Sequence, residues 1–390
     1  MSARLSNRPD TVMGRALAAR ALALASMQQT TRPRSGKGLL DLTLPATTML
    51  PEHVRQSAKD ALDRGETHYT SRPGVPELRR AIAERSTEQG FAAVADTTVV
   101  TNGGAEAIYI ALQAVLSANS TALVIEPVAP HVIEMITFIG AKIERLVPNV
   151  EERFVPNVDA IARSSANVLV LSSPSLISGV AIPNRDLAAS IGAAIARGME
   201  VILDRSGVPC LYDPHEARFA DSELGSKVIT IGSFSAGYGL DGWRVGYFTA
   251  PSDRVGKLRG LKQAMSICTT AVSQYAALAA LEGPDDWLTI RREGYRTRLA
   301  TAVELLRSSP FAVVNPDAYP ALLIDAHQYG PNDREVAERL ARDCGIKVDP
   351  GSGLGSATAG FIRIDLGIEE SVFRTGIDRL AMVRNGAAHE

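Results

Sequence analysis

Polar side chains that could do chemistry follow apolar runs of this sequence. Asp204 ends one such run, Ser233 and Ser235 end another, and Arg244 comes shortly afterwards. Open α/β sheets bind ligands outside the carboxyl ends of their strands, so we expect these side chains to meet at one sheet edge. For Asp204 and Arg244, a role as buried structural partners is the alternative.

The segment 101–105 (TNGGA) closes an expected strand and opens an expected helix. Amide groups at the start of a helix can bind a phosphate, although a tight turn between strand and helix has the same pattern. Residues 237–242 fit GxGxxG but lack the flanking strand, helix and acidic residue of a dinucleotide site. Ser233, His131 and Asp204 have the residue types of a catalytic triad, but nothing in the sequence fixes their geometry.

Strand-like and helical segments alternate through the first two thirds of the chain. This alternation predicts an α/β fold with a mostly parallel, seven-stranded sheet and helices on both faces. Several strand runs are continuously apolar, as in strands buried on both faces. The expected strands are residues 98–101, 122–126, 143–147, 167–172, 200–204, 228–233 and 244–249, and the expected helices include residues 75–89, 105–118 and 185–197.

A second region begins near Asp285. It contains a long charged helix at 287–308 and strand-like runs at 321–325 and 361–366, which predict a smaller α+β domain. The chain is therefore divided into residues 1–45 as an N-terminal helix or arm, 46–285 as the large domain and 286–390 as the small C-terminal domain.

Composition excludes several classes of protein. The chain has 41 Lys+Arg and 43 Asp+Glu, a formal net charge of -2, so its overall charge favours neither nucleic acid nor an anionic membrane. Cys210, Cys268 and Cys344 have the spacing of neither a disulfide framework nor a zinc site, which favours a cytoplasmic setting. Residues 13–27 have apolar residues at helical spacing but are too short to span a bilayer, so we expect a packing helix there.

Together, in this order and spacing, these features resemble the fold type I pyridoxal phosphate (PLP) enzymes, specifically class I/II aminotransferases such as aspartate aminotransferase. The resemblance covers about residues 40 to 385 and includes the segments HYTSRPG, TNGGAEAI, ILDRSG, SFSAGYGLDGWRVGY and FIRIDLGI. It implies a homodimer in which Tyr69 serves the neighbouring subunit. It also implies a pyridine nitrogen paired with Asp204, a substrate carboxylate held by Arg363, and a PLP phosphate bound by Gly104, Ala105, Ser233, Ser235 and Arg244.

The lysine that these enzymes require is missing from its expected place. By the resemblance it belongs at Ala236, and residues 236–241 contain no lysine. A ring-oxygen donor, a stacking aromatic ring and a tyrosine of the family correspond to Leu176, Ala129 and Gly207. We therefore expect no covalent PLP, with any PLP bound non-covalently, and a widened apolar cleft whose substrate contacts include Ala129, Leu176, Gly207, Ala236 and Arg363.

Three functions remain open at this stage. The first is an enzyme without a PLP Schiff base that acts on a bulky apolar metabolite by dehydration, addition or cyclisation, with Asp204, Tyr69, Tyr238 and His131 as its acid/base candidates. The second is a non-catalytic binding or regulatory protein on the same dimeric scaffold. The third is a residual PLP-dependent aminotransferase. In all three the expected partner is a small molecule, with no metal, nucleic acid or membrane.

Overall fold

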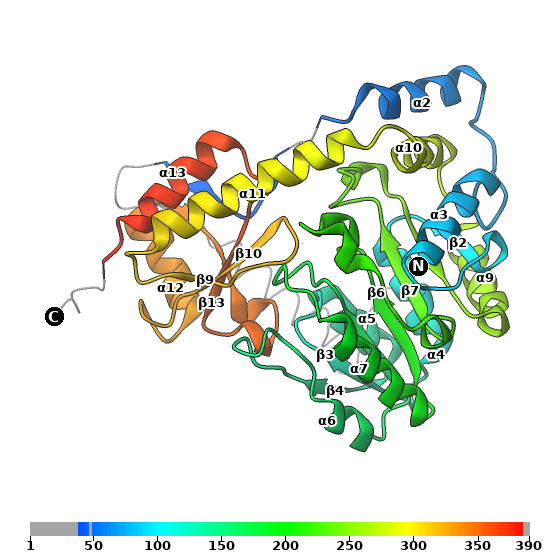
Figure 1. Ribbon diagram of the computed structural model, residues 1–390, viewed down its shortest axis with the longest axis horizontal. Helices are drawn as coiled ribbons and strands as arrows, with labels where there is room; N and C mark the ends of the chain where they lie inside the picture. The colour runs from blue at the N-terminus through cyan, green and yellow to red at the C-terminus, as the bar shows by residue number, and fades with distance from the viewer. Residues whose placement is uncertain (1–37, 47–48, 385–390) are drawn as a thin grey trace, which may run out of the picture.

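The computed structural model describes residues 38–46 and 49–384. A large sheet has helices on both faces, and a second, smaller sheet lies beside it (Figure 1). The large sheet has seven strands in the order β2-β8-β7-β6-β5-β3-β4. They are β2 Thr98–Thr101, β3 Thr121–Ile125, β4 Lys142–Leu146, β5 Val168–Ser172, β6 Glu200–Asp204, β7 Ile229–Ser233 and β8 Gly246–Thr249.

The seven predicted strands are all present, with small shifts at their ends. The pairs β3–β4, β3–β5, β5–β6 and β6–β7 are parallel, whereas β8 runs antiparallel to β7 and to β2. The prediction of a mostly parallel, seven-stranded sheet is therefore confirmed. β8 begins at Gly246 and not at Arg244, because Arg244 has a left-handed backbone with a φ of 54° that cannot continue a strand.

Helices cover the large sheet on both faces. Those predicted for residues 75–89, 105–118 and 185–197 are α3, α4 and α7. The helices of this part are α2 Glu52–Asp63, α3 Pro76–Glu88, α4 Gly104–Val115, α5 Pro130–Ile139, α6 Val158–Arg163, α7 Asn184–Ala196, α8 Ser222–Gly225, α9 Ser252–Ser266 and α10 Ala271–Glu282.

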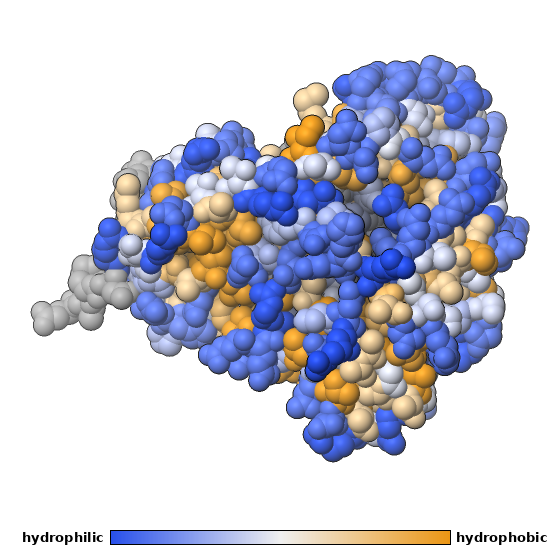
Figure 2. All heavy atoms as spheres, in the orientation of Figure 1, coloured by the Kyte–Doolittle hydropathy of each residue, from blue (hydrophilic) through white to orange (hydrophobic). Residues whose placement is uncertain are grey.

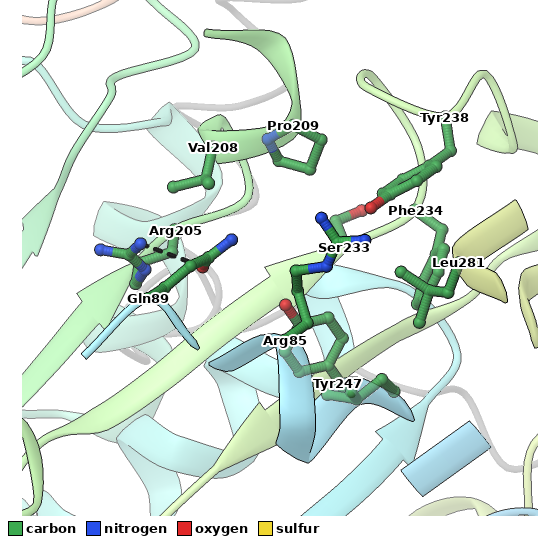
Figure 3. A pocket seen from close by; sticks show the side chains of 11 residues that line it. Arg85, Gln89, Arg205, Val208, Pro209, Ser233, Phe234, Tyr238, Tyr247 and Leu281 are labelled. Atoms are coloured by element: carbon green, nitrogen blue, oxygen red, sulfur yellow. Dashed lines mark hydrogen bonds between the residues drawn. The ribbon is translucent and has the colours of Figure 1, made fainter. Parts of the chain in front are cut away.

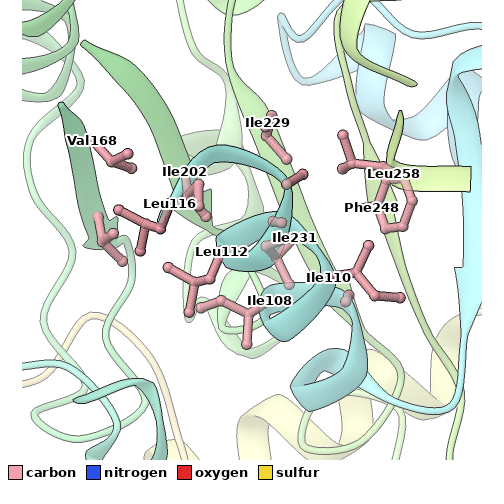
Figure 4. Close-up of a cluster of buried hydrophobic side chains, with 14 of the residues drawn as sticks. Ile108, Ile110, Leu112, Leu116, Val168, Ile202, Ile229, Ile231, Phe248 and Leu258 are labelled. Carbon is pink, nitrogen blue, oxygen red and sulfur yellow. The ribbon is translucent and has the colours of Figure 1, made fainter. Parts of the chain in front are cut away.

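The core explains why these runs are strands. Val170 and Leu171 of β5 are both fully buried although neighbouring side chains on a strand point to opposite faces, so helices must cover both faces. On one face Leu112 of α4 packs with Ile202 and Ile231 of the sheet, as Figure 4 shows; on the other, α7 packs in a separate apolar cluster. Each buried side chain of this size contributes about 1.5–3 kcal/mol to folding.

Strand order places the functional edge of the sheet. β4 and β5 lie on opposite sides of β3, so the chain reverses its direction across the sheet there. Ligands of open α/β sheets bind at the carboxyl ends of strands near such a reversal. Ser172 of β5 pairs with Asp204 of β6, and Ser233 ends the adjacent strand β7. Asp204 and Ser233 therefore lie along one edge.

The C-terminal part has its own sheet and core. Its four strands lie in the order β12-β13-β10-β9, and the predicted long charged helix is α11. The elements of this part are α11 Asp286–Leu306, β9 Ala312–Val313, β10 Ala321–Asp325, α12 Asp333–Arg339, β11 Ile346–Lys347, β12 Asp349–Pro350, β13 Phe361–Asp365 and α13 Glu370–Ala381.

The predicted boundary after an N-terminal arm of residues 1–45 needs a correction. β1 (Leu40–Asp41) pairs in parallel with β11, and the fully buried Leu42 packs in the core of the C-terminal part. Residues 40–42 thus belong with the small domain, because pairing with β11 buries their apolar side chains. The helix predicted for residues 13–27 lies outside the described residues. Within residues 38–46 and 49–384, no helix is both long and apolar enough to cross a membrane.

We predict that Gly246→Ala destabilises the protein. A Cβ atom on Gly246 would lie 2.4 Å from the carbonyl carbon of Gly103 and from the amide nitrogen of Gly104, so the start of α4 must move. Overpacking of this kind costs about 1–3 kcal/mol. Urea unfolding should show a lower midpoint for the variant.

Gly256→Ala is the matched control. Gly256 lies within α9 and has open space where a Cβ atom would be, so alanine there should be neutral or stabilise by up to about 1 kcal/mol. Equal midpoints for the two variants would show that the close contact at Gly246 is absent in solution.

Candidate functional site

Asp204 and His131 lie near enough to each other at the sheet edge for the charge of each to affect the pKa of the other. The backbone N–H of Ser206 donates to Asp204 Oδ1 at 2.9 Å. Burial raises the pKa of Asp204, an effect that the Ser206 hydrogen bond and the charge of His131 oppose. His131 lies in the first turn of α5, and its residue surface is exposed. Desolvation of its ring by neighbouring protein atoms lowers its pKa, whereas the charges of Asp204 and Glu134 favour its protonated form.

The start of α4 lies against the ends of β7 and β8. A Cβ atom on Gly104 would lie 3.2 Å from Ser233 Cβ and 3.3 Å from Ser206 Oγ. A Cβ atom on Gly103, which has a φ of 87°, would lie only 2.2 Å from Arg244 Nη2. Glycine at both positions therefore lets the helix start pack closely against two hydroxyls and a guanidinium. We call this region the anion cup.

The anion cup has the chemistry that an anion requires. The first N–H groups of a helix have no partner within the helix, and the dipole of α4 adds partial positive charge there. Arg244 donates through Nη1 to Asp241 O at 3.0 Å and has no carboxylate within ion-pair distance among the described residues. Its positive charge is therefore available for a ligand.

The predicted cofactor-binding residues are gathered at this cup. Ala105 follows Gly104 in the first turn of α4, and the N–H of Ser235 donates to Ser233 Oγ at 3.1 Å. Sequence reasoning missed Ser206, whose hydroxyl faces Gly104. Its place two residues after Asp204, in the turn that leaves β6, is the signal that could have identified it.

Ala236 and Leu176, both predicted as substrate contacts, pack against the same apolar cluster. The cluster also contains the rings of Tyr212, Tyr295 and Tyr319. Tyr295 and Tyr319 stack with centroids 4.2 Å apart, and Tyr212 lies 5.9 Å from Tyr319. No pattern in the sequence marks these three tyrosines, which come from distant segments.

The space expected at Gly207 is filled. A Cβ atom there would lie 2.6 Å from Pro174 O, so glycine permits close packing of two loops and does not open a cleft. Ala129 is the residue just before α5 and packs against the main core. It is not part of the apolar cluster around Ala236. The expected widening of the cleft therefore does not extend to Gly207.

Two of the predicted acid/base candidates lie away from Asp204. Tyr238 is 8% exposed and packs between Phe234 and Trp287 in the core near α3 and α10. Burial raises its pKa to about 12, which makes it a poor base at neutral pH. Tyr69 is 80% exposed on the loop between α2 and α3. Its expected place at the site of a neighbouring subunit, and the homodimer itself, stay predictions.

Arg363 is already paired with acidic residues of its own domain. Its Nη1 atom donates to Asp349 Oδ2 at 3.2 Å, and Nη2 lies 4.0 Å from Asp365 Oδ2. The Nε atom is buried without a hydrogen-bond partner among the described residues. A substrate carboxylate would have to compete with two carboxylates for this guanidinium.

Comparisons with known proteins agree with this architecture. The model of the family described as aminotransferase class I and II matches residues 41–380. The aspartate/prephenate aminotransferase of Thermus thermophilus is 28% identical over 90% of this chain and 92% of its own. The arginine–pyruvate transaminase of Pseudomonas aeruginosa is 28% identical over 85% of this chain and 86% of its own.

A solved structure supports the same conclusion. Aspartate aminotransferase from Thermus thermophilus with maleate superposes with a TM-score of 0.82 at 27% identity, over 94% of this chain and 95% of that one. The site is thus built on the scaffold of PLP-dependent transferases. The chain belongs to the aminotransferase class I and II family.

This family implies PLP, which the residues present fit only in part. The anion cup suits a phosphate, since glycines let the free amides of α4 lie close to Ser206 and Ser233 and Arg244 supplies charge. Asp204 at the end of β6 suits a pyridine nitrogen. The segment 233–241 contains no lysine and so offers no amine for a covalent bond. Lys262 is fully buried on α9 outside that segment, and its Nζ atom has no hydrogen-bond partner among the described residues.

Asp365 should make stability depend on pH. Burial raises its pKa to about 6 despite the charge of Arg363. The folded pKa lies above the unfolded value of about 3.9, so its stabilising neutral form is present at low pH and is lost as the pH rises through about 6. The free energy of unfolding of the wild type, relative to Asp365→Asn, should therefore fall between about pH 4 and pH 7. Urea unfolding at the two pH values measures this difference.

Asp378→Asn is the control for that measurement. Asp378 is an exposed carboxylate on α13 in the same domain, and its side chain is remote from the Arg363 ion pairs. Its removal should leave the pH dependence unchanged. A wild-type advantage over Asp365→Asn that grows from about pH 4 to pH 7 would contradict the raised pKa.

Proposed function

We propose that this chain is a member of the aminotransferase family that acts without covalently bound PLP. Asp204 and His131 transfer protons to and from a bulky, largely apolar metabolite, in a reaction such as dehydration, addition or cyclisation. An anionic group of the metabolite occupies the anion cup at Gly104 and Arg244. The observation that carries the proposal is an acid/base pair beside an anion cup, with alanine at position 236 and no lysine in its segment.

The pKa shifts of the pair suit acid/base chemistry near neutral pH. Burial moves the pKa of Asp204 upward, toward neutral pH, and lowers the pKa of His131, which favours its neutral, proton-accepting form. The two shifts bring the pKa values of these groups closer together, which favours proton transfer between them. Asp204 also remains close to the anion cup through the turn that contains Ser206.

The ion pairs of Arg363 argue against amino-acid substrates. An amino acid bound for transamination presents a carboxylate, and an arginine binds it best with a free, bidentate guanidinium. Here Asp349 and Asp365 already neutralise Arg363. A new carboxylate would bring a third negative charge into a buried region, which is unfavourable.

The apolar cluster at Ala236 favours an apolar substrate body. Leu176 and the ring of Tyr295 pack there, and Arg291 donates to Ala236 O at 3.0 Å, which fixes this segment against α11. The cytoplasmic setting and the homodimer remain part of the proposal. Cys210 and Cys268 form no disulfide bond within the described part of the chain, as is usual in a reducing compartment.

We predict that Ala236→Lys binds PLP covalently and that the wild type does not. The variant supplies the missing amine next to a cup and an aspartate that suit the phosphate and ring nitrogen of PLP. After incubation with PLP and reduction with borohydride, mass spectrometry should find the cofactor attached to the variant alone. Ala236→Met, which has similar length without an amine, is the matched control and should remain unmodified.

Two results would contradict this prediction. Cofactor fixed to a lysine of the wild type, Lys262 included, would show that an amine outside the segment 233–241 replaces the missing one and would favour a residual aminotransferase. An unmodified Ala236→Lys would show that the phosphate and ring contacts no longer accommodate PLP.

The second test measures proton transfer. The protein is incubated in D₂O with a panel of apolar compounds that carry one carboxylate or phosphate group, and mass spectrometry records product formation and deuterium uptake. Asp204→Asn keeps the shape of the side chain but cannot ionise, and general acid/base catalysis contributes a factor of about 100 or more. We therefore expect turnover or exchange to fall by about that factor.

Asp241→Asn is the control for turnover. Asp241 is an exposed carboxylate on the neighbouring loop, and its replacement should preserve the rate. Equal rates for Asp204→Asn and the wild type would exclude Asp204 as a catalytic residue. Binding of a compound without turnover or deuterium uptake would favour the non-catalytic binding protein.

A further inference from the structure

A second region that could bind a ligand is a cavity at the N-terminal end of α11. It has a volume of about 480 Å³. Its walls come from the end of α3, the segment 208–218 and the start of α11. In Figure 2, most of the surface below α11 is hydrophilic, whereas apolar residues are exposed near the start of that helix, beside α10.

A smaller cavity continues this one toward the sheet. The two share Arg85, Gln89, Val208, Pro209 and Tyr238 as lining residues. Figure 3 shows this inner part, where Arg85 reaches from α3 toward Ser233 and Tyr238, and where Arg205 is hydrogen-bonded to Gln89. Ser233 lines the inner part and also borders the anion cup, so the strand end of β7 lies between the two regions.

The lining of the joined cavities is strongly cationic. Four arginines face it, Arg85, Arg205, Arg218 and Arg292, and Glu88 is the one carboxylate residue in the lining. The chain as a whole has a net charge of -2, so this excess of positive charge is local. Low-dielectric walls strengthen the potential of charges gathered in a cavity.

Three of these arginines lack acidic partners among the described residues, and the fourth has a distant one. The contact of Arg85 Nε with Glu88 Oε2 spans 3.9 Å, and the other three guanidinium groups have no carboxylate within 4.0 Å in the described part of the chain. The structural cations of this protein are arranged differently, since Arg153 and Arg254 each have a carboxylate at 2.6–2.7 Å. The cationic cavity thus has uncompensated charge.

Neutral groups hold two of these arginines, Arg205 and Arg292, in place. Arg205 is 8% exposed and donates from Nη2 to Gln89 Oε1 at 3.1 Å and to Ala217 O at 2.7 Å. Arg292 Nε donates to Leu211 O at 2.9 Å. Burial lowers the pKa of Arg205 to about 10, so it still carries its charge at neutral pH. Amide and carbonyl oxygens orient these groups but leave their charge unbalanced.

The rest of the lining is apolar or aromatic. Val208, Pro209, Leu288 and Ala217 cover part of the wall, and Tyr238 lies where the two cavities join. A ligand that fits this lining has more than one anionic group and a partly apolar body. Planar guanidinium groups bind carboxylate and phosphate through paired hydrogen bonds, so either anionic group suits the site.

We propose that this cationic cavity is a second ligand site, which binds a small organic polyanion through Arg85, Arg218 and Arg292. The site is distinct from the anion cup and does not depend on the reaction proposed above. A ligand in the cavity contacts Tyr238, which lies two residues after Ala236 in the segment that follows β7.

Calorimetric titration with pyrophosphate and with citrate tests this site. Wild-type protein in a chloride buffer should bind at least one of the two probes, and the Arg85→Gln/Arg218→Gln double variant should bind it about tenfold or more weakly. Both arginines are exposed, so the double variant should unfold at the wild-type temperature. Pyrophosphate binding alone assigns phosphoryl groups to the ligand, and citrate binding alone assigns carboxylates.

Two further variants locate the bound anion. Arg80→Gln removes an exposed arginine from the same helix outside the cavity and should retain wild-type affinity. Arg244→Gln weakens the anion cup and should also retain it. The proposal is overturned if neither probe binds, if Arg80→Gln weakens binding as much as the double variant, or if affinity is lost with Arg244→Gln and kept in the double variant.

Discussion

The start of α4 lies so close to β8 that neither segment has room for a side chain where they meet. Gly246 faces the backbone of Gly103 and Gly104, and the side chain that Gly103 lacks would occupy the place of the Arg244 guanidinium. This contact brings the free amides of α4 to the sheet edge. It also requires the left-handed backbone of Arg244, which directs the chain from η4 (Asp241–Trp243) into β8.

The remaining site residues depend on that contact through the core. Buried side chains of α4 pack in one apolar cluster with those of β6 and β7. This packing fixes the position of the first turn of α4 relative to the ends of both strands. Asp204 and Ser233 are the last residues of those strands. The distances within the anion cup are therefore set by packing around α4. Ser206 and His131 add hydrogen bonding and charge to a geometry that already exists.

The strands could be predicted from the sequence because a strand that is buried on both faces is a continuous run of apolar residues, as in β5. The sequence also predicted that Asp204, Ser233 and Arg244 would meet, because strand ends share an edge in this class of fold. It did not predict the contact of Gly207 with Pro174 or the ion pair of Arg363 with Asp349. Such contacts depend on how separate loops and domains pack, and no local pattern encodes them.

The arginines of this molecule fall into two groups, those with a nearby carboxylate and those without one, and the overall composition does not distinguish them. Arg363, Arg153 and Arg254 have nearby carboxylates and act within the protein. Arg244 in the anion cup and Arg218 in the cationic cavity have none among the described residues. A guanidinium without a carboxylate partner receives little electrostatic stabilisation from the rest of the protein, so its charge can still attract an external anion. Ser233 at the end of β7 borders the anion cup and also lines the inner cavity, so a single strand end separates the two regions of unpaired positive charge.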